Sequence, residues 1–225
     1  MKKYKYELHC HTGMVSRCGR VHPEEIVKLY KEQGYSGIVV TDHYSPMTWR
    51  KPLQIICPHK TGGNEFYLSS YREMKKYETD DFSVLFGIEL RHYGTANDYL
   101  IYGVEEEWFE KQGNLMSVYE KDVFKLMDSQ GYLVYQAHPF RPGIRRCNPD
   151  YIHGVEVYNG KCNKEQNQKA LQWAQENGKL MVSGSDFHVT KQLAKGGIIT
   201  TKPIRTNSDL LQVLKSQDFE MIQNY

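Results

Sequence analysis

ELHCHTGMVSRCGR, residues 7–20, places two histidines one residue apart at the end of a strand-like run. Side chains at positions i and i+2 of a β-strand point to the same face, so His9 and His11 would aim two imidazoles at one place. Such a pair suits a metal ion and is a poor filling for an apolar core. A chain with nine histidines in 225 residues also produces an H-x-H pair by chance, so the remaining sequence has to decide.

Short apolar runs alternate along the chain with segments of helical spacing. This alternation predicts a mainly parallel sheet covered by helices, and about seven strands in a single domain favour a barrel over an open sheet. In such a barrel the chemistry lies where the C-terminal ends of the strands meet the following loops. We expect one domain over residues 1–225, with the long loop 45–64 as a candidate lid. Strands are expected at 4–9, 36–43, 82–90, 98–104, 132–138, 154–159, 179–188 and 196–200, and helices at 22–35, 65–79, 117–131, 164–178 and 207–216.

The composition is that of an ordinary globular protein, with 25% charged and 40% hydrophobic residues. A net charge of +2 does not indicate a nucleic-acid wrapper or a polybasic membrane binder. No apolar run approaches the length of a membrane span, and the start MKKYKYELHC lacks the apolar core of a signal peptide. The five cysteines are scattered without C-x-x-C spacing, which favours a reducing compartment, and we expect a cytoplasmic protein.

Residues that bind metals fall repeatedly at the predicted C-terminal ends of strands. Each has an ordinary alternative when taken alone: His138 before a proline can simply end a strand, Glu89 can pair with Arg91, and Asp42 can cap a turn beside a surface His43. Their joint placement at one rim of the barrel favours a metal site, because scattered surface residues would not gather there. Imidazole and carboxylate together suit Zn²⁺, Mn²⁺ or Fe²⁺. The set is His9, His11, Asp42, His43, Glu89, His138, Glu156, Asp186 and His188.

Five short motifs resemble those of the polymerase and histidinol phosphatase (PHP) family, in the family's order and over nearly the whole chain. They are H-x-H-T at 9–12, T-D-H at 41–43, G-I-E at 87–89, A-H-P at 137–139 and G-S-D-F-H at 184–188. The resemblance implies a distorted (β/α)₇ barrel with a trinuclear metal centre at the C-terminal ends of the strands. It also implies hydrolysis of phosphoesters.

The resemblance further implies how the ligands are shared among the ions. His9, His11, Glu89 and Asp186 correspond to the ligands of a first ion. Glu89 would bridge to a second ion that also takes His138, and a third ion would take His43 and His188. Asp42 would orient His43 or its neighbour from behind.

The sequence departs from the family pattern at two places. Where a third-site ligand is common, this chain has Arg17, which cannot bind a metal but could grip a phosphate. The neighbouring Cys18 could ligate as a thiolate or be merely a buried thiol. No histidine follows the strand that holds Glu156, so Asn159, Cys162 or water would have to substitute. We therefore expect two to three divalent ions, with Cys18, Asp42 and Glu156 as additional candidates.

Basic residues follow the proposed ligand His138, and Arg141, three residues beyond it, is the best candidate for a phosphate clamp. Arg17 and Arg145 are further candidates for substrate binding, and Asp186 could move protons. We expect a metal-dependent phosphoric ester hydrolase in which an activated hydroxide attacks a small phosphomonoester, as in a histidinol phosphatase.

Two other functions remain open. The first is a phosphodiesterase or 3′–5′ exonuclease acting on nucleotides or oligonucleotides. No basic stripe or aromatic platform for nucleic acid is evident, so a small substrate is favoured over nucleic acid, and no membrane partner is expected. The second belongs to another class, a non-catalytic module that a metal stabilises for binding.

Overall fold

The sheet of this protein curves until its two edges nearly meet. In the computed structural model, which describes residues 2–48 and 63–225, the strands follow the order β10-β9-β1-β2-β4-β5-β6-β7-β8, and β3 pairs with β4. The strands of the described residues are β1 (Tyr4–Cys10), β2 (Gly37–Val40), β3 (His43–Tyr44), β4 (Ser83–Arg91), β5 (Asp98–Tyr102), β6 (Leu133–Gln136), β7 (Gly154–Asn159), β8 (Leu180–Gly184), β9 (Gly196–Thr200) and β10 (Glu220–Gln223).

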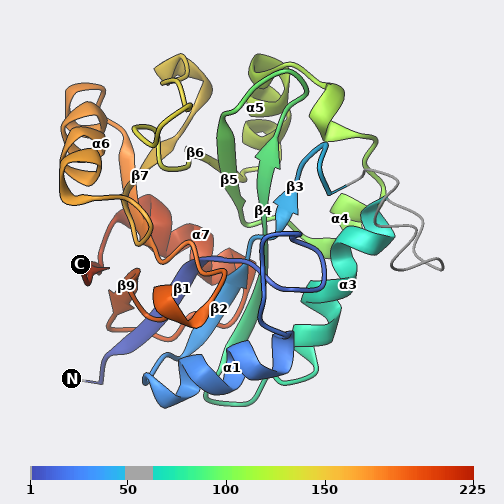
Figure 1. Cartoon of the computed structure of the whole chain (residues 1–225), viewed down its shortest axis with the longest axis vertical. Coiled ribbons are helices and arrows are strands. Elements are labelled where there is room, and N and C mark those ends of the chain that lie inside the picture. Colours follow the sequence, from blue (N-terminus) through green and yellow to red (C-terminus); the bar gives the residue numbers. More distant parts are fainter. Residues whose placement is uncertain (1, 49–62) are drawn as a thin grey trace.

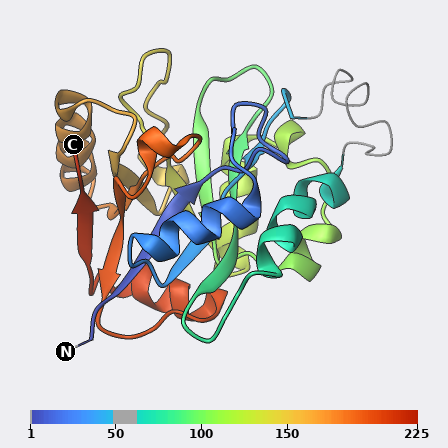
Figure 2. The same cartoon turned by 60° about the horizontal axis from the view of Figure 1, so that its bottom comes forward.

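Helices surround this sheet. They lie around its outside in Figure 1, except for the last helix, α7 (Asn207–Ser216), which lies across the end of the barrel opposite the long loops in Figure 2, where it is drawn in red. None of the helices in the described part of the chain has the length and apolar character needed to cross a membrane. The helices are α1 (Pro23–Glu32), α3 (Asn64–Lys75), α4 (Glu106–Glu110), α5 (Glu120–Ser129), α6 (Lys164–Glu176) and α7 (Asn207–Ser216).

The barrel closes at the end that carries the long loops. The backbone N–H of Phe187, just after β8, donates to the carbonyl of His9 (3.0 Å), and the N–H of His11 donates back to Phe187 (2.9 Å). Cys10 and Phe187 thus form a parallel bridge between the end of β1 and the segment after β8. The predicted α/β barrel is confirmed.

The sheet departs from a regular (β/α)₇ arrangement in strand number and direction. It has more strands than the seven expected, and β5 runs antiparallel to both β4 and β6. The six residues between β4 and β5 allow a hairpin but are too few for a parallel crossover. Of the predicted lid 45–64, residues 49–62 lie outside the described residues, and Asn64 already begins α3.

An apolar cluster fills the barrel at the end away from the loops. It joins inward-facing residues of the strands to one face of α7, so the polar side chains inside the barrel are confined to the other end. Among its fully buried members are Tyr6, Leu8, Val39, Leu100, Val182, Leu210 and Leu214.

A β-bulge in β1 turns His9 toward the barrel interior. The register between β1 and β2 shifts between Glu7 and Cys10. Leu8 packs in the interior cluster, whereas Cys10, two residues on, packs outside it in the cluster that holds the apolar residues of α1. The strict alternation of side chains between the two faces is therefore broken. A bulge generally has this effect, and it redirects a side chain.

The buried carboxylate of Glu7 supplies the hydrogen bonds that this bulge needs. Its Oε1 accepts from the backbone N–H groups of Leu8 (3.0 Å), His9 (2.9 Å) and Ser185 (2.9 Å), and its Oε2 accepts from the Tyr30 hydroxyl (2.8 Å). Burial raises the pKa of Glu7 to about 7, although the hydrogen bonds from Ser185, His9 and Tyr30 oppose that shift. One side chain thus ties β1, the segment after β8 and α1 together.

We expect Glu7→Ala to lower the free energy of unfolding by about 3 kcal/mol or more, because three backbone N–H groups and a tyrosine hydroxyl lose their acceptor. Glu7→Gln keeps one acceptor oxygen and the shape of the side chain, so its loss should be less than about half as large. Urea denaturation followed by circular dichroism measures both. Equal losses in the two variants would show that the acceptor role is not what matters.

The pH dependence of stability should reveal the same carboxyl group. A pKa raised from 4.5 to about 7 means that the folded protein binds this proton more tightly than the unfolded chain does. The stabilisation is therefore complete below about pH 4.5 and is lost as the pH rises through 7. Relative to Glu7→Gln, the wild type should lose up to about 3 kcal/mol between about pH 4.5 and 8. Urea titrations of both proteins in EDTA test this, and a difference independent of pH would contradict it.

Candidate metal centre

Seven predicted ligands converge at the loop end of the barrel, from the C-terminal ends of different strands. They form three overlapping groups, and within each group the potential ligand atoms lie within 4.8 Å of one another. The groups are His9, Glu89 and His138; His9, His11 and Asp186; and His11, His43 and His188. The expectation placed Glu89 with His9, His11 and Asp186 at a first ion; here Glu89 groups with His9 and His138, and His11 also groups with His43 and His188.

Glu89 lies at the centre of the cluster. Its Oε1 is 3.1 Å from His9 Nε2 and 3.2 Å from His138 Nε2, and its Oε2 is 3.3 Å from His11 Nε2. His43, paired with Glu89 across β3 and β4, directs its Nδ1 to the same Oε2. One carboxylate thus faces all three groups, which is the geometry of a bridging ligand.

The alternative reading of Glu89, a simple ion pair with Arg91, does not hold. Arg91 instead donates from Nε and Nη2 to the two oxygens of Asp98, at 2.6 and 2.5 Å. Asp98 is fully buried and also lies 3.7 Å from His138 Nε2.

Hydrogen bonds made by the Nδ1 atoms of His9 and His11 leave the Nε2 atoms of both rings available. His9 Nδ1 lies 2.7 Å from Glu156 Oε1, so the ring donates its Nδ1 proton there. Ser16 donates its hydroxyl proton to Asp42 (2.6 Å), so it accepts from His11 Nδ1 at 3.1 Å. Both Nε2 atoms are fully buried and have no hydrogen-bond partner among the residues that the structure describes. Orphaned imidazole nitrogens that face carboxylates are what a metal site requires.

Asp42 and Glu156 act through other residues. Asp42 accepts from the backbone N–H of Thr12 (2.7 Å) and from the hydroxyls of Thr12 (2.8 Å), Ser16 (2.6 Å) and Ser70 (2.6 Å). The second oxygen of Glu156 accepts from the backbone N–H of His138 (3.0 Å) and from Asn159 (2.9 Å). Asp42 therefore orients His11 through Ser16, as well as the backbone at His43, whose N–H donates to the same Ser16 hydroxyl (2.9 Å).

Two of the ligands have backbone conformations that residues other than glycine rarely adopt. The φ angles are +31° at His138 and +50° at Asp186, both in the left-handed region. Strain of this kind costs on the order of 1 kcal/mol per residue and persists where the surrounding structure imposes it, most often at functional sites. Both residues lie two positions beyond the end of a strand, where this conformation turns the side chain into the barrel mouth.

The buried carboxylates and histidines of the cluster shift each other's pKa values. Burial raises the pKa of Glu89, but His43, His9 and His11 hold it well below its usual range. Burial likewise opposes charging of His9, yet Glu156, Asp186 and Glu89 raise the pKa of its ring well above the ordinary value. Protons on the histidines thus balance the buried carboxylates, and divalent cations would take over that balance. The residues present fit Zn²⁺, Mn²⁺ or Fe²⁺.

Cys18 lies beside the third group. Burial raises the pKa of its thiol, but hydrogen bonds with His188 and His43 lower it by more, to about 6. At neutral pH the group is therefore largely a thiolate, the form of cysteine that binds metals.

A hollow of about 480 Å³ opens over His43 and His188 and forms the mouth of the site. The predicted Arg17 and Arg141 line it, whereas Arg145 is not among the described residues that do. Arg141 Nη1 donates to Asp186 Oδ2 at 3.0 Å. Three further cations of the mouth were not expected from the sequence: Arg20, Arg91 and Lys161. Lys161 follows the end of β7, so the strand-end rule could have found it.

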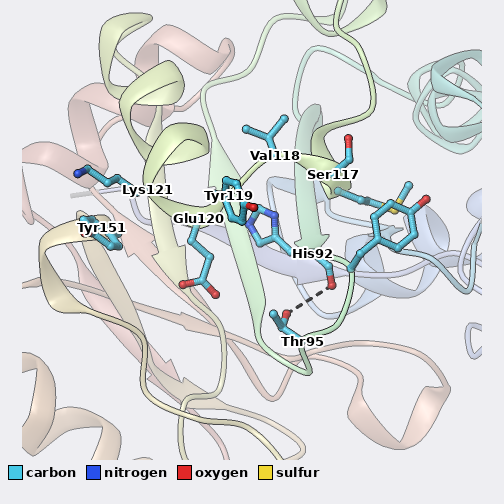
Figure 3. Close-up of a pocket in the computed structure, with 10 residues that line it drawn as sticks. His92, Thr95, Ser117, Val118, Tyr119, Glu120, Lys121 and Tyr151 are labelled. Carbon is cyan, nitrogen blue, oxygen red and sulfur yellow. Dashed lines mark hydrogen bonds between the residues drawn. The ribbon is translucent and has the colours of Figure 1, made fainter.

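A second and larger hollow, of about 650 Å³, lies elsewhere and shares no residue with the cluster. His92, Val118, Tyr119 and Glu120 line it (Figure 3). His92 directly follows Arg91, and alternation along the strand turns its ring away from the barrel mouth. His92 thus lies apart from the cluster.

The chain is similar to known proteins in sequence and in fold. A family model described as PHP-associated matches residues 164–219, from α6 to beyond α7. Uncharacterized protein MJ0417 of Methanocaldococcus jannaschii is 35% identical over 82 residues, which make up 30% of this chain and 35% of that protein. The match thus spans about a third of the relative's length.

Three solved structures share the fold at low sequence identity. PsfC of Pseudomonas syringae has a TM-score of 0.67 at 13% identity, covering 94% of this chain and 88% of that one. A Bifidobacterium adolescentis protein described as a metal-dependent phosphoesterase has a TM-score of 0.55 at 16% identity, covering 93% and 95%. The lesion-specific endonuclease Q of Pyrococcus furiosus has a TM-score of 0.64 at 13% identity, covering 98% and 58%.

We expect Ser16→Ala to weaken metal binding by about 10- to 100-fold, because His11 Nδ1 loses its acceptor and Asp42 loses a donor. The free energy of unfolding should fall by about 1–3 kcal/mol. Zinc affinity is measured by competition with a chromophoric chelator. Ser69→Ala is the matched control, because that hydroxyl donates only to the carbonyl of Phe66 on α3 (2.6 Å). An unchanged zinc affinity in Ser16→Ala would refute the orienting role.

Proposed function

We propose that this PHP-type domain protein hydrolyses phosphoric esters with two or three divalent ions held by the buried histidine and carboxylate cluster. The observation that carries the proposal is the set of buried, unpartnered Nε2 atoms facing Glu89 beneath a mouth lined by cations. Ions bound there would supply an activated water and neutralise charge on the phosphoryl group.

The residues of the chain divide the remaining work. Arg141 lies at the edge of the cluster, where its guanidinium can bind the phosphoryl oxygens and stabilise the charge that grows on them. Burial raises the pKa of Asp186, but His9, His11 and His188 hold it well below its usual range, so this carboxylate stays ionised, which suits a metal ligand better than a proton acceptor. In the reaction water adds to phosphorus, the ester P–O bond breaks, and the proton that water loses ends on the leaving alcohol.

We assign the third site to His11, His43, His188 and Cys18. Three imidazoles and one thiolate form a donor set that suits Zn²⁺ better than Mn²⁺. Cys18 then takes the place of the ligand that the sequence lacks at Arg17. The four cysteines of the described residues, Cys10, Cys18, Cys147 and Cys162, are free thiols, as the proposed reducing cytoplasm requires.

A small phosphomonoester is the substrate class that we favour. The described residues that line the mouth include no Phe, Tyr or Trp ring on which a nucleic-acid base could stack. The phosphodiester alternative is supported by the shared fold with endonuclease Q, one structure of which is a complex with a 27-mer duplex. A non-catalytic, metal-stabilised module is the alternative of another class.

One experiment separates these functions. Metal-loaded protein and an EDTA-stripped sample of the same preparation are compared on p-nitrophenyl phosphate, bis-p-nitrophenyl phosphate, histidinol phosphate, phosphotyrosine and a short single-stranded oligonucleotide. Metal-dependent turnover of monoesters supports the proposal, and preference for the diesters supports the alternative. A loaded protein without turnover that unfolds when stripped would be a structural module.

Asp186→Asn should remove at least one bound ion per chain and lower turnover by more than about 100-fold, because it replaces a charged ligand by a neutral one. Metal content by mass spectrometry and hydrolysis of p-nitrophenyl phosphate are measured on the same sample. Asp150→Asn, an exposed carboxylate on the surface, is the matched control and should change neither. Full metal content and activity in Asp186→Asn would rule out the proposed centre.

A further inference from the structure

The second hollow, of about 650 Å³, has no part in the proposed hydrolysis. It lies between the turn that follows β4 and the segment that leads into α5 (Figure 3). Its volume is in the range of sites that take small molecules. Of the four large apolar side chains that are exposed in the described part of the chain, two line it, Tyr93 (51%) and Tyr119 (81%). Exposed rings that gather at one hollow indicate a binding surface.

Three tyrosines from separate segments line this second hollow. Tyr93 belongs to the turn after β4, Tyr119 directly precedes α5, and Tyr151 ends a short 3₁₀ turn. The N–H of Tyr93 donates to the carbonyl of Met116 (3.0 Å), and its hydroxyl accepts from Asn114 (3.3 Å), so this ring is held in place without a ligand. The faces of such rings attract cations and stack on flat groups.

The same hollow is lined by a buried histidine with an unused acceptor. His92 is only 5% exposed, and its Nδ1 atom is buried without a hydrogen-bond partner among the described residues. Burial lowers the pKa of this ring, against the opposing effects of Glu120 and of a hydrogen bond with the backbone of Val118. The ring is therefore neutral at pH 7, and with its proton directed to Val118 its Nδ1 remains an acceptor. A donor brought by a ligand would remove the cost of leaving that acceptor unpaired.

Glu120 supplies the hollow with a negative charge. It is the first residue of α5, where the positive end of the helix dipole favours an anion. Across the described ranges 2–48 and 63–225 its carboxylate forms no ion pair. Lys121, the one cation among the described lining residues, extends away from Glu120 in Figure 3. The carboxylate beside the tyrosines is thus left without a compensating charge.

Two hydroxyl groups add further acceptors to the lining. Thr95 Oγ1 donates to the carbonyl of His92 (3.4 Å), which Figure 3 marks with a dashed line, and Ser117 Oγ donates to the carbonyl of Asn114 (2.7 Å). Because their protons are used in these hydrogen bonds, both oxygens have only lone pairs left to offer a ligand. The hollow therefore combines acceptors, one carboxylate and aromatic faces, a set that suits a donor-rich cation.

We propose that the second hollow is a ligand site for a small organic cation with a flat apolar body, such as an aromatic amidinium. The charged group lies against Glu120, and the flat body stacks on the tyrosines. This site goes beyond the proposed hydrolysis and does not depend on it. The mouth of the metal cluster is lined by five cations and no described acidic residue, so it repels such a ligand, and the two hollows select opposite charges.

The test compares two probes of nearly the same shape that differ in charge, benzamidine and benzamide. Dissociation constants are measured on zinc-loaded protein by titrations that follow the ligand's NMR signals. Benzamidine should bind about tenfold more tightly or better, because a hydrogen bond to a charged pair is about twice as strong as a neutral one. Added salt should reduce that preference. Equal affinity for the two probes would overturn the proposal.

Glu120→Gln should bring the preference for benzamidine close to unity, because it removes the charge and keeps the shape of the side chain. Asp122→Asn is the matched control. It removes the same charge from the same first turn of α5, but Asp122 is exposed and is not among the residues that line the hollow. This control should keep the wild-type ratio of the two dissociation constants. A preference that survives in Glu120→Gln would contradict the assignment.

Tyr119→Ala should weaken the binding of both probes by about threefold or more, because each loses a ring on which to stack. The Tyr119 side chain makes no capping hydrogen bond to α5, so the helix does not depend on it. Tyr225→Ala, which removes another exposed ring (62%) outside the hollow, is the control and should change neither constant. Unchanged affinities in Tyr119→Ala would argue against the stacking role. A blocked Gly-Arg-Gly peptide that binds more tightly than benzamidine would make the hollow a protein-docking site and overturn the small-molecule assignment.

Discussion

The centre depends on one buried carboxylate that is not part of it. Glu7 accepts the N–H groups of Leu8 and His9 at the bulge of β1 and the N–H of Ser185 after β8. Without an acceptor there, the bulge would leave buried donors unsatisfied, and a regular strand would keep His9 on the outer face. The same contact brings the residue before Asp186 against β1. Two ligand segments from opposite ends of the chain are thereby held to one side chain.

Hydrogen bonds to the Nδ1 atoms of the histidine rings decide which ring nitrogens face the proposed metal site. Glu156 takes the Nδ1 proton of His9 and also holds the backbone at His138, while Asp42 acts on His11 through Ser16. Both oxygens of each of these carboxylates accept hydrogen bonds from protein donors, whereas Glu89 and Asp186 face mainly imidazole rings. This contrast separates supporting carboxylates from ligating ones more clearly than burial does, because all four are buried.

The sequence alone predicted much of this arrangement, for physical reasons that also explain what it missed. His9, His11, Glu89 and Asp186 could be found because the C-terminal ends of barrel strands meet in space wherever they lie in the chain. The antiparallel course of β5 was missed because strand periodicity carries no direction. The roles of Glu7, Ser16 and Asp98 were missed because each depends on a register shift or a cross-strand contact that no local pattern encodes. Arg20 lies in a loop, where residue type alone does not say which side chains face the mouth.

The bridge between Cys10 and Phe187 bears on how the protein reaches its working state. The ligands begin at His9 and end at His188, so the complete donor set exists only after nearly the whole chain has been made and the barrel has closed. Contacts of such long sequence separation form late and slowly. A nascent chain that ends before β8 offers only part of the set, and a misfolded one holds its histidines apart. Ions at the proposed centre would therefore find all their ligands only in a chain whose barrel has closed.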